Sequence, residues 1–197
     1  MEAIQAFLKK KDVEISTKRY LIDAMGAMAQ GLFCSLLIGT IINAMGLLFD
    51  IRALKIVVAT VGGIKYTVGG LAMAMSGPAM AVAIGRALHC PPLVLYSLLT
   101  VGFATNALGG AGGPLAVLFV AIATSEIGKL AAGETKVDIL VTPLVTIGVG
   151  ATLAALCAPP LGKLAMQTGT VIMWATELQP FLTVSYTHLT LPTIYSV

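Results

Sequence analysis

One segment of the chain combines an acid, an amide and an indole within a strongly apolar stretch. Trp174, Glu177 and Gln179 lie close together and are followed by Pro180. A carboxylate at bilayer depth is expensive, so it usually faces a cavity, a partner or a substrate. Carboxylates and amides hydrogen-bond hydroxyl groups, and an indole offers a rigid apolar face on which a sugar ring can stack. We therefore predict that these three residues bind a carbohydrate. The alternative is that Glu177 lies at a water interface, with Trp174 in an interfacial aromatic belt.

Glycine and proline interrupt the apolar runs at several points. Pro78 and Pro143 each remove a backbone hydrogen-bond donor from an apolar run, which predicts a kink or break in the helix. Gly109 and Gly113 belong to the most glycine-dense stretch, residues 106–114, which predicts a tight turn between closely packed helices. This stretch lacks the Lys-Ser/Thr ending of a P-loop. Because interrupted helices expose main-chain groups to cargo in transporters, we predict a helix-breaking or gating role for these four residues.

The remaining titratable residues do not form a catalytic pattern. Glu126 and Lys129 are three residues apart near the end of a predicted span, so we expect them to pair with each other or to contact lipid headgroups. His89 has no acid or second ligand close to it in sequence. The cysteines show no CxxC spacing; they are Cys34, Cys90 and Cys157. We expect no catalytic residue, no metal site and no cofactor.

The composition places the chain in a membrane. Of its 197 residues, 57% are hydrophobic and 11% are charged, against about 25% charged residues in soluble domains. The mean hydropathy is +0.94. Basic residues crowd residues 1–20, and the net charge of +3 comes from the flanks of apolar runs, which does not indicate a nucleic-acid surface. These features predict an all-α, polytopic membrane protein with a cytoplasmic, amphipathic segment at 1–20 and a transmembrane domain at 21–182.

Runs of about 20 apolar residues mark the candidate spans. We predict five to six transmembrane or re-entrant helices, at residues 21–45, 66–88, 92–108, 115–130, 139–157 and, as a re-entrant or cavity-lining element, 164–182. The mixed stretch at 47–65 is expected to lie along the membrane interface or to begin a tilted helix. More basic residues fall on the side of the N-terminus than on the other side, so we expect the N-terminus to be cytoplasmic.

The C-terminal segment differs from the rest of the chain. Residues 183–193, TVSYTHLTLPT, resemble a translation of the transposon-end adaptor DNA that is used to prepare sequencing libraries. We therefore expect residues 183–197 to be an adaptor-derived artefact, and the native chain to be truncated near Leu182.

Four ordered motifs resemble a known family. They are residues 14–29 (EISTKRYLIDAMGAMA), 87–95 (ALHCPPLVL), 135–146 (TKVDILVTPLVT) and 172–181 (IMWATELQPF). Together they are similar to the IIC membrane subunits of the bacterial phosphoenolpyruvate-dependent sugar phosphotransferase system, and more narrowly to a stand-alone IIC-like group. Members of this family are longer, so the resemblance implies that the chain is the N-terminal half.

The resemblance also implies an activity and partners. It implies a multi-pass sugar permease of the bacterial cytoplasmic (inner) membrane that works by alternating access, forms a homodimer and cooperates with cytoplasmic IIA and IIB phospho-carrier proteins. The chain would then be the membrane component of a protein-phosphohistidine-sugar phosphotransferase complex and would carry no phospho-carrier residue itself. Two alternatives remain: a small-metabolite carrier of the same fold that works without phosphoryl transfer, and a regulatory membrane protein that transports nothing.

Overall fold

The computed structural model describes residues 11–13 and 16–190, with the backbone alone for residue 172 and residues 175–190. This part of the chain is helical apart from one β-hairpin. Its first half contains η1 (Lys18–Asp23), α2 (Ala24–Leu32), η2 (Phe33–Leu37), α3 (Ile38–Leu48), α4 (Arg52–Lys55), β1 (Val57–Val61), β2 (Ile64–Thr67), α5 (Val68–Ala74) and α6 (Ser76–Ala87). Its second half contains α7 (Pro92–Gly109), η3 (Gly110–Gly112), α8 (Gly113–Ala131) and α9 (Asp138–Thr190). The elements η1 and η2 are π-helical, so residues 18–48 form one nearly continuous helix.

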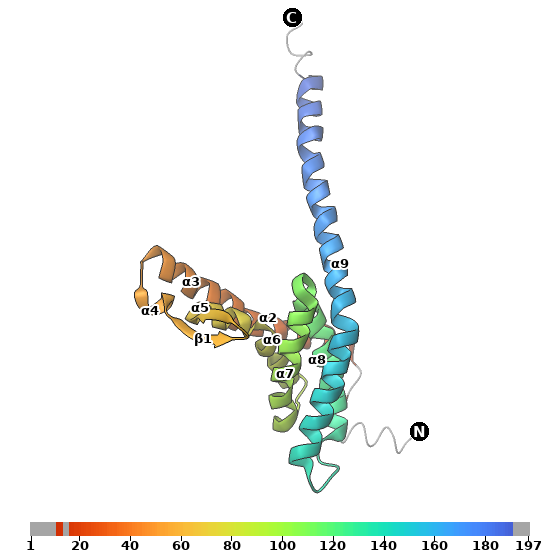
Figure 1. Cartoon of the computed structure of the whole chain (residues 1–197). Helices are drawn as coiled ribbons and strands as arrows, with labels where there is room; N and C mark the ends of the chain where they lie inside the picture. The colour runs from red at the N-terminus through yellow and green to blue at the C-terminus, as the bar shows by residue number, and fades with distance from the viewer. Residues whose placement is uncertain (1–10, 14–15, 191–197) are drawn as a thin grey trace, which may run out of the picture.

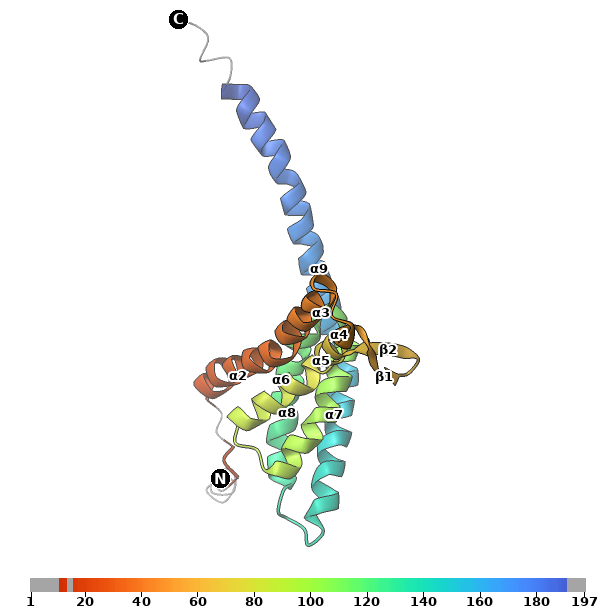
Figure 2. The same ribbon diagram turned by 90° about the vertical axis from the view of Figure 1, so that its left-hand side faces the viewer.

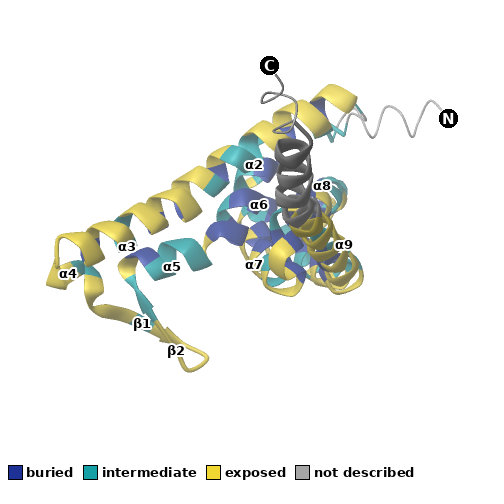
Figure 3. Cartoon of the chain, turned by 90° about the horizontal axis from the view of Figure 1, so that it is seen from above, coloured by how far each residue is buried: buried dark blue, intermediate teal, exposed yellow. Residues whose placement is uncertain are grey.

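The core lies where α6, α7, α8 and the first part of α9 pack together, with α2 across α6 (Figures 1 and 2). Buried apolar side chains from three of these helices fill it, among them Met80, Ile84, Val94, Leu98 and Val117. Seen from above, buried residues concentrate in this bundle, whereas α3, α4 and the strands are mostly exposed (Figure 3). Large apolar side chains exposed in this way, as on α3, suit contact with lipid or protein in a membrane.

The predicted all-α, polytopic membrane class is confirmed. Within the described residues, three helical stretches are long and apolar enough to cross a membrane: Lys18–Leu48, Pro92–Ala131 and Asp138–Val171. The pair α5 and α6 is a fourth if it is one span bent by 50°. The stretch from Pro92 to Ala131 turns back at η3, so that α7 and α8 pack against each other. The predicted five to six segments counted these two helices separately.

The predicted re-entrant element at 164–182 is not separate, because α9 continues through Pro159 and Pro160. Prolines in an apolar helix are tolerated where neighbouring helices support the backbone. Here the turn η3 and the end of α7 pack against α9 just after the prolines: an added Cβ at Gly112 would lie 2.6 Å from the carbonyl oxygen of Leu161, and one at Gly162 would lie 2.5 Å from that of Gly109. At 1.5 Å per residue, α9 is about 80 Å long, more than twice the hydrocarbon thickness of about 30 Å. Its C-terminal part projects beyond the bundle (Figure 1).

The mixed stretch at 47–65, predicted to lie along the interface or to begin a helix, contains a short helix and most of an antiparallel hairpin. Strands β1 and β2 pair with Val61 opposite Ile64, across the turn at Gly62 and Gly63. Both glycines have positive φ, 58° and 83°, as the two-residue turns that match strand twist require. The hairpin belongs to an arm that α3, α4 and α5 complete and that extends sideways from the bundle (Figure 1).

Candidate functional site

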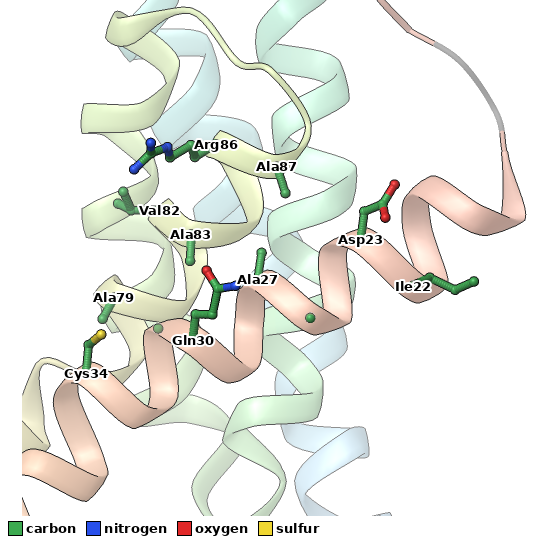
Figure 4. Close-up of a pocket in the computed structure, with 12 residues that line it drawn as sticks. Ile22, Asp23, Ala27, Gln30, Cys34, Ala79, Val82, Ala83, Arg86 and Ala87 are labelled. Carbon is green, nitrogen blue, oxygen red and sulfur yellow. The ribbon is translucent and has the colours of Figure 1, made fainter.

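A groove of about 820 Å³ runs between the first long helix and α6. Half of its lining residues are glycine or alanine, so little side-chain volume fills the space between the helices. Its polar groups come from Asp23, Gln30 and Arg86, and Gln30 reaches from α2 toward α6 (Figure 4). An acid, an amide and a guanidinium between apolar walls are groups that can hydrogen-bond a polar ligand.

The helices meet closely at the floor of this groove. A Cβ added at Gly31 would lie 2.6 Å from the carbonyl oxygen of Ala79, so glycine is needed where α2 crosses α6. Ser35 donates a hydrogen bond of 2.7 Å to the carbonyl oxygen of Gly31 within the first helix, which satisfies its buried hydroxyl. Backbone contact therefore fixes the crossing, and Gly31 and Ala79 both line the groove.

At one end the groove continues into a cluster of charged groups. A second pocket, of about 290 Å³, shares Asp23 and Ala87 with the groove and is also lined by Asp12, Arg19 and His89. The guanidinium of Arg19 binds the Asp12 carboxylate in a bidentate manner, with N–O distances of 2.6 and 3.2 Å. His89 Nδ1 lies 3.1 Å from the same carboxylate. The hydrogen bond from Arg19, with help from His89 and the charge of Lys129, lowers the pKa of Asp12 to about 2.

Lys129 extends this cluster into the bundle. Its side chain is only 2% exposed, and its Nζ lies 2.8 Å from a carboxylate oxygen of Glu126. The same nitrogen donates to the carbonyl oxygens of Asp12, at 2.9 Å, and Leu88, at 3.1 Å. The expected pairing of Glu126 with Lys129 is therefore present, but the lysine also joins the N-terminal segment to α6 and α8. Close by, burial raises the pKa of the Cys90 thiol, which disfavours a nucleophilic thiolate there.

A separate polar contact lies at the break between α5 and α6. The helices bend by 50° at this point, and Asn106 of α7 donates a hydrogen bond of 3.3 Å to the hydroxyl of Ser76. Cβ atoms added at Gly77 or Gly113 would collide with Asn106. The end of α7, the start of α8 and the start of α6 thus converge on one amide side chain.

The four predicted helix-breaking residues lie at three different places in the structure. Pro78 is the third residue of α6, next to the bend, and Gly109 and Gly113 flank the turn η3. Pro143 lies in the second turn of α9, at the opposite end of the bundle from η3, and does not interrupt that helix. Their role in gating stays a prediction.

The predicted carbohydrate-binding residues lie on the C-terminal part of α9. The Trp174 side chain is 64% exposed. The backbone of Glu177 and Gln179 continues the helix, and their side chains lie outside the described residues. The structure does not bring this segment to the groove or to the charged cluster, and carbohydrate binding by these residues stays a prediction.

A comparison with known protein families identifies the family of this chain. The model of the family described as "Phosphotransferase system, EIIC" matches residues 22–186, which includes the groove, the bend and most of α9. The chain belongs to this EIIC family. Searches among curated proteins and among solved structures gave no match.

Membership of the EIIC family confirms the resemblance found in the four motifs. It makes the chain a multi-pass membrane subunit of a phosphotransferase-system sugar transporter, a class of protein that cooperates with IIA and IIB proteins. No group of His, Cys, Asp or Glu that could hold a metal ion occurs among the described residues.

Sequence reasoning missed several groups that this EIIC structure places together. Asp12 and His89 are far apart in the chain and touch only because the N-terminal segment folds against the α6–α7 turn. No sequence pattern predicted this contact, because an aspartate and a histidine that are far apart in the chain have no characteristic spacing. Asn106 carried a usable signal, because an amide immediately before a glycine-rich turn in an apolar run needs a partner.

Proposed function

We propose that this EIIC protein translocates a carbohydrate across the bacterial cytoplasmic membrane by alternating access, while IIA and IIB proteins pass a phosphoryl group to the sugar at the inner face. The family match over residues 22–186 is the observation that carries this proposal. The chain itself supplies the path and the binding groups. The phospho-carrier residues belong to the partner proteins.

The bend between α5 and α6 supports an alternating-access mechanism. Interrupted helices are the elements that move or expose main-chain groups in many transporters. Ser76 and Asn106 hold the bend against α7, and Pro78 follows it directly. In this proposal the bend and the glycine turn at 109–113 act as hinges between the outward-facing and inward-facing states.

For substrate recognition we retain Glu177, Gln179 and Trp174 as the sugar-contacting residues. Their chemistry suits hydroxyl groups and the apolar face of a sugar ring. Helix α9 presents Trp174 with most of its surface uncovered, which leaves room for a substrate or for a second copy of the chain in a homodimer.

The orientation in the membrane is also part of the proposal. The N-terminal segment, the α6–α7 turn and the α8–α9 turn lie at the same end of the bundle, where Lys11 pairs with Glu134 at 2.5 Å. This end collects the basic residues expected on the cytoplasmic side. We therefore place the Asp12–His89 cluster at the cytoplasmic face.

The experiment uses inside-out membrane vesicles from a strain that carries the gene and from its deletion strain. The vesicles receive a panel of radiolabelled sugars with the cytoplasmic phospho-carrier proteins, with and without phosphoenolpyruvate. The proposal expects a sugar phosphate that needs both the gene and phosphoenolpyruvate. Gene-dependent uptake without phosphoenolpyruvate would instead identify a non-phosphorylating carrier. The absence of any gene-dependent transport across the panel would favour a regulatory protein.

A further inference from the structure

The carboxylate of Asp12 occupies a socket of nitrogen donors. Arg19 contacts both carboxylate oxygens, and Nδ1 of His89 lies 3.1 Å from one of them. Lys129 approaches from the other side and donates to the backbone oxygen of Asp12. Four segments thus converge on one residue: the N-terminal segment, η1, the α6–α7 turn and α8.

Arg19 and Lys129 of this socket are buried in the bundle, whereas the carboxylate of Asp12 is half exposed. Arg19 is 9% exposed and Lys129 is 2% exposed as whole residues. Both also donate to the carbonyl oxygen of Leu88, at 2.8 and 3.1 Å, so their positions do not depend on Asp12 alone. The Asp12 side chain is 49% exposed and belongs to a segment that precedes the first helix. The socket can therefore persist when Asp12 leaves it.

The charges around the socket indicate that it would attract an anion if Asp12 left it. Glu126 balances Lys129, and Asp12 balances Arg19. Lys18 and Asp23, which also line the adjoining pocket, offset each other. Without the Asp12 carboxylate, the buried positive charge of Arg19 lacks a counter-ion. Arg19 Nε is also buried and has no hydrogen-bond partner among the described residues. An uncompensated buried charge is strongly unfavourable, so the socket needs an anion.

We propose that the Arg19–His89–Lys129 socket is a binding site for a phosphate group, and that Asp12 is a built-in competitor that occupies it when no phosphate is present. A guanidinium fork matches two oxygens of a phosphate as well as it matches a carboxylate. A phosphate has a third oxygen, which His89 can reach. Lys129 Nζ loses the carbonyl oxygen of Asp12 as an acceptor when Asp12 leaves, and it can donate to a phosphate oxygen instead. The adjoining pocket of about 290 Å³ leaves space for the rest of a phosphomonoester.

The phosphate could be carried by a soluble phosphomonoester or by a lipid headgroup. Both present the same chemistry to the socket. This inference does not rest on sugar transport, since the binding experiment contains neither sugar nor phosphoenolpyruvate. A negative binding result would therefore leave the transport experiment unaffected, and a negative transport result would leave the phosphate site unaffected.

The experiment measures inorganic phosphate binding by isothermal titration calorimetry to the full chain in phosphatidylcholine nanodiscs. Asp12→Asn keeps the size of the side chain but removes its charge, so we expect affinity at least about tenfold higher than in the wild type. Asp50→Asn is the matched control. Asp50 also has a positive φ, of 50°, and pairs with Lys55 at 2.5 Å, but it lies outside the socket. This control should bind phosphate no better than the wild type.

Two further measurements keep the test decisive. Adding His89→Gln to Asp12→Asn should lower phosphate affinity severalfold without disturbing the bundle, because the His89 side chain is 75% exposed. In the wild type, saturating phosphate should accelerate tryptic cleavage after Lys11, because the segment that carries Asp12 leaves the socket while Arg19 stays buried in η1. Equal affinity of Asp12→Asn, Asp50→Asn and the wild type would overturn the proposal, as would unchanged cleavage.

Nanodiscs that contain phosphatidic acid, which has a phosphomonoester headgroup, separate the two sources. If the headgroup occupies the socket, inorganic phosphate should bind the Asp12→Asn protein more weakly in these discs than in phosphatidylcholine. Equal affinity in both discs assigns the socket to a soluble phosphomonoester. Either result supports a phosphate site, and absence of phosphate binding by the Asp12→Asn protein in both discs overturns it.

Discussion

Lys129, in the last turn of α8, donates a hydrogen bond to the carbonyl oxygen of Leu88, 3.1 Å away at the C-terminal end of α6. The same oxygen accepts a hydrogen bond of 2.8 Å from Arg19 of η1. One carbonyl at a helix end, where carbonyls lack partners within their own helix, thus joins η1, α6 and α8. The contact explains why a lysine is buried in this bundle.

Replacing Lys129 with methionine should strongly destabilise the protein. The change keeps the apolar stem but leaves Glu126 as a buried carboxylate without its cation and removes one donor from Leu88. Breaking a buried ion pair from one side typically costs about 3–5 kcal/mol. We expect a clearly lower midpoint of thermal unfolding, followed by the loss of monodisperse protein in detergent.

The control for this prediction is the double variant Glu126→Gln with Lys129→Met. Removing the carboxylate as well should restore much of the lost thermal midpoint, because no uncompensated charge then remains. If Lys129→Met alone unfolds at the wild-type temperature, the buried pair does not stabilise the bundle.

Gly102 should not tolerate alanine. A Cβ added there would lie 2.5 Å from the carbonyl oxygen of Gly77 and 2.6 Å from the Cβ of Ala81, so α6 and α7 would have to separate. Overpacking of this kind costs about 1–3 kcal/mol. Gly148 is the control, because an added Cβ meets nothing within 4 Å on exposed α9. We expect Gly102→Ala to lower the thermal midpoint and Gly148→Ala to leave it equal or slightly higher. Equal effects would contradict the close crossing.

Much of the fold could be predicted from the sequence, and the reasons are physical. Apolar runs of bilayer length predict helices because no other open structure satisfies the backbone in lipid. The turn at 109–113 was predicted from its glycines. The hairpin was not predicted, because the stretch at 47–65 was interpreted from its charged residues. The pattern that indicates a hairpin is Gly62-Gly63 between β-branched residues. The continuity of α9 was missed because support for Pro159 and Pro160 comes from Gly109, which is distant in sequence.

The charged cluster could not be predicted, since its members are brought together only by the tertiary fold. Asp12 and Lys129 are 117 residues apart, yet the lysine donates to the Asp12 carbonyl. Local spacing predicted only the Glu126–Lys129 pair. The groove between α2 and α6 likewise depends on the crossing of Gly31 and Ala79, which no sequence pattern indicates.

The Asp12 contacts should weaken in acid. The pKa of Asp12 is lowered from 3.8 to about 2, so the folded state favours its ionised form. The stabilisation is fully present above the unfolded pKa and is lost as the pH falls through about 2. Because the side chain is half exposed, we expect less than about 1 kcal/mol. The difference in thermal midpoint between the wild type and Asp12→Asn should be constant from about pH 7 to 5 and should shrink between about pH 4 and 2. A difference that persists unchanged at pH 2 would contradict the assigned contacts.

Substitutions on the C-terminal part of α9 test the proposed carbohydrate contacts. Gln179→Leu removes both hydrogen-bonding functions of the amide, and Glu177→Gln removes the charge while keeping the shape of the side chain. If these groups bind sugar hydroxyls, Gln179→Leu should raise the KM of phosphoenolpyruvate-dependent sugar phosphorylation severalfold, since a neutral hydrogen bond contributes about 0.5–1.5 kcal/mol. Glu177→Gln should raise it about tenfold, since a hydrogen bond to a charged group contributes about 1.5–3 kcal/mol. Gln167→Leu is the matched control, because Gln167 is an exposed glutamine on the same helix, more than two turns before Glu177. It should leave both kcat and KM unchanged. If Gln167→Leu and Gln179→Leu have the same effect, the loss reflects insertion or packing of α9, and the sugar contacts lie elsewhere, with the groove lined by Gln30 as the next site to test.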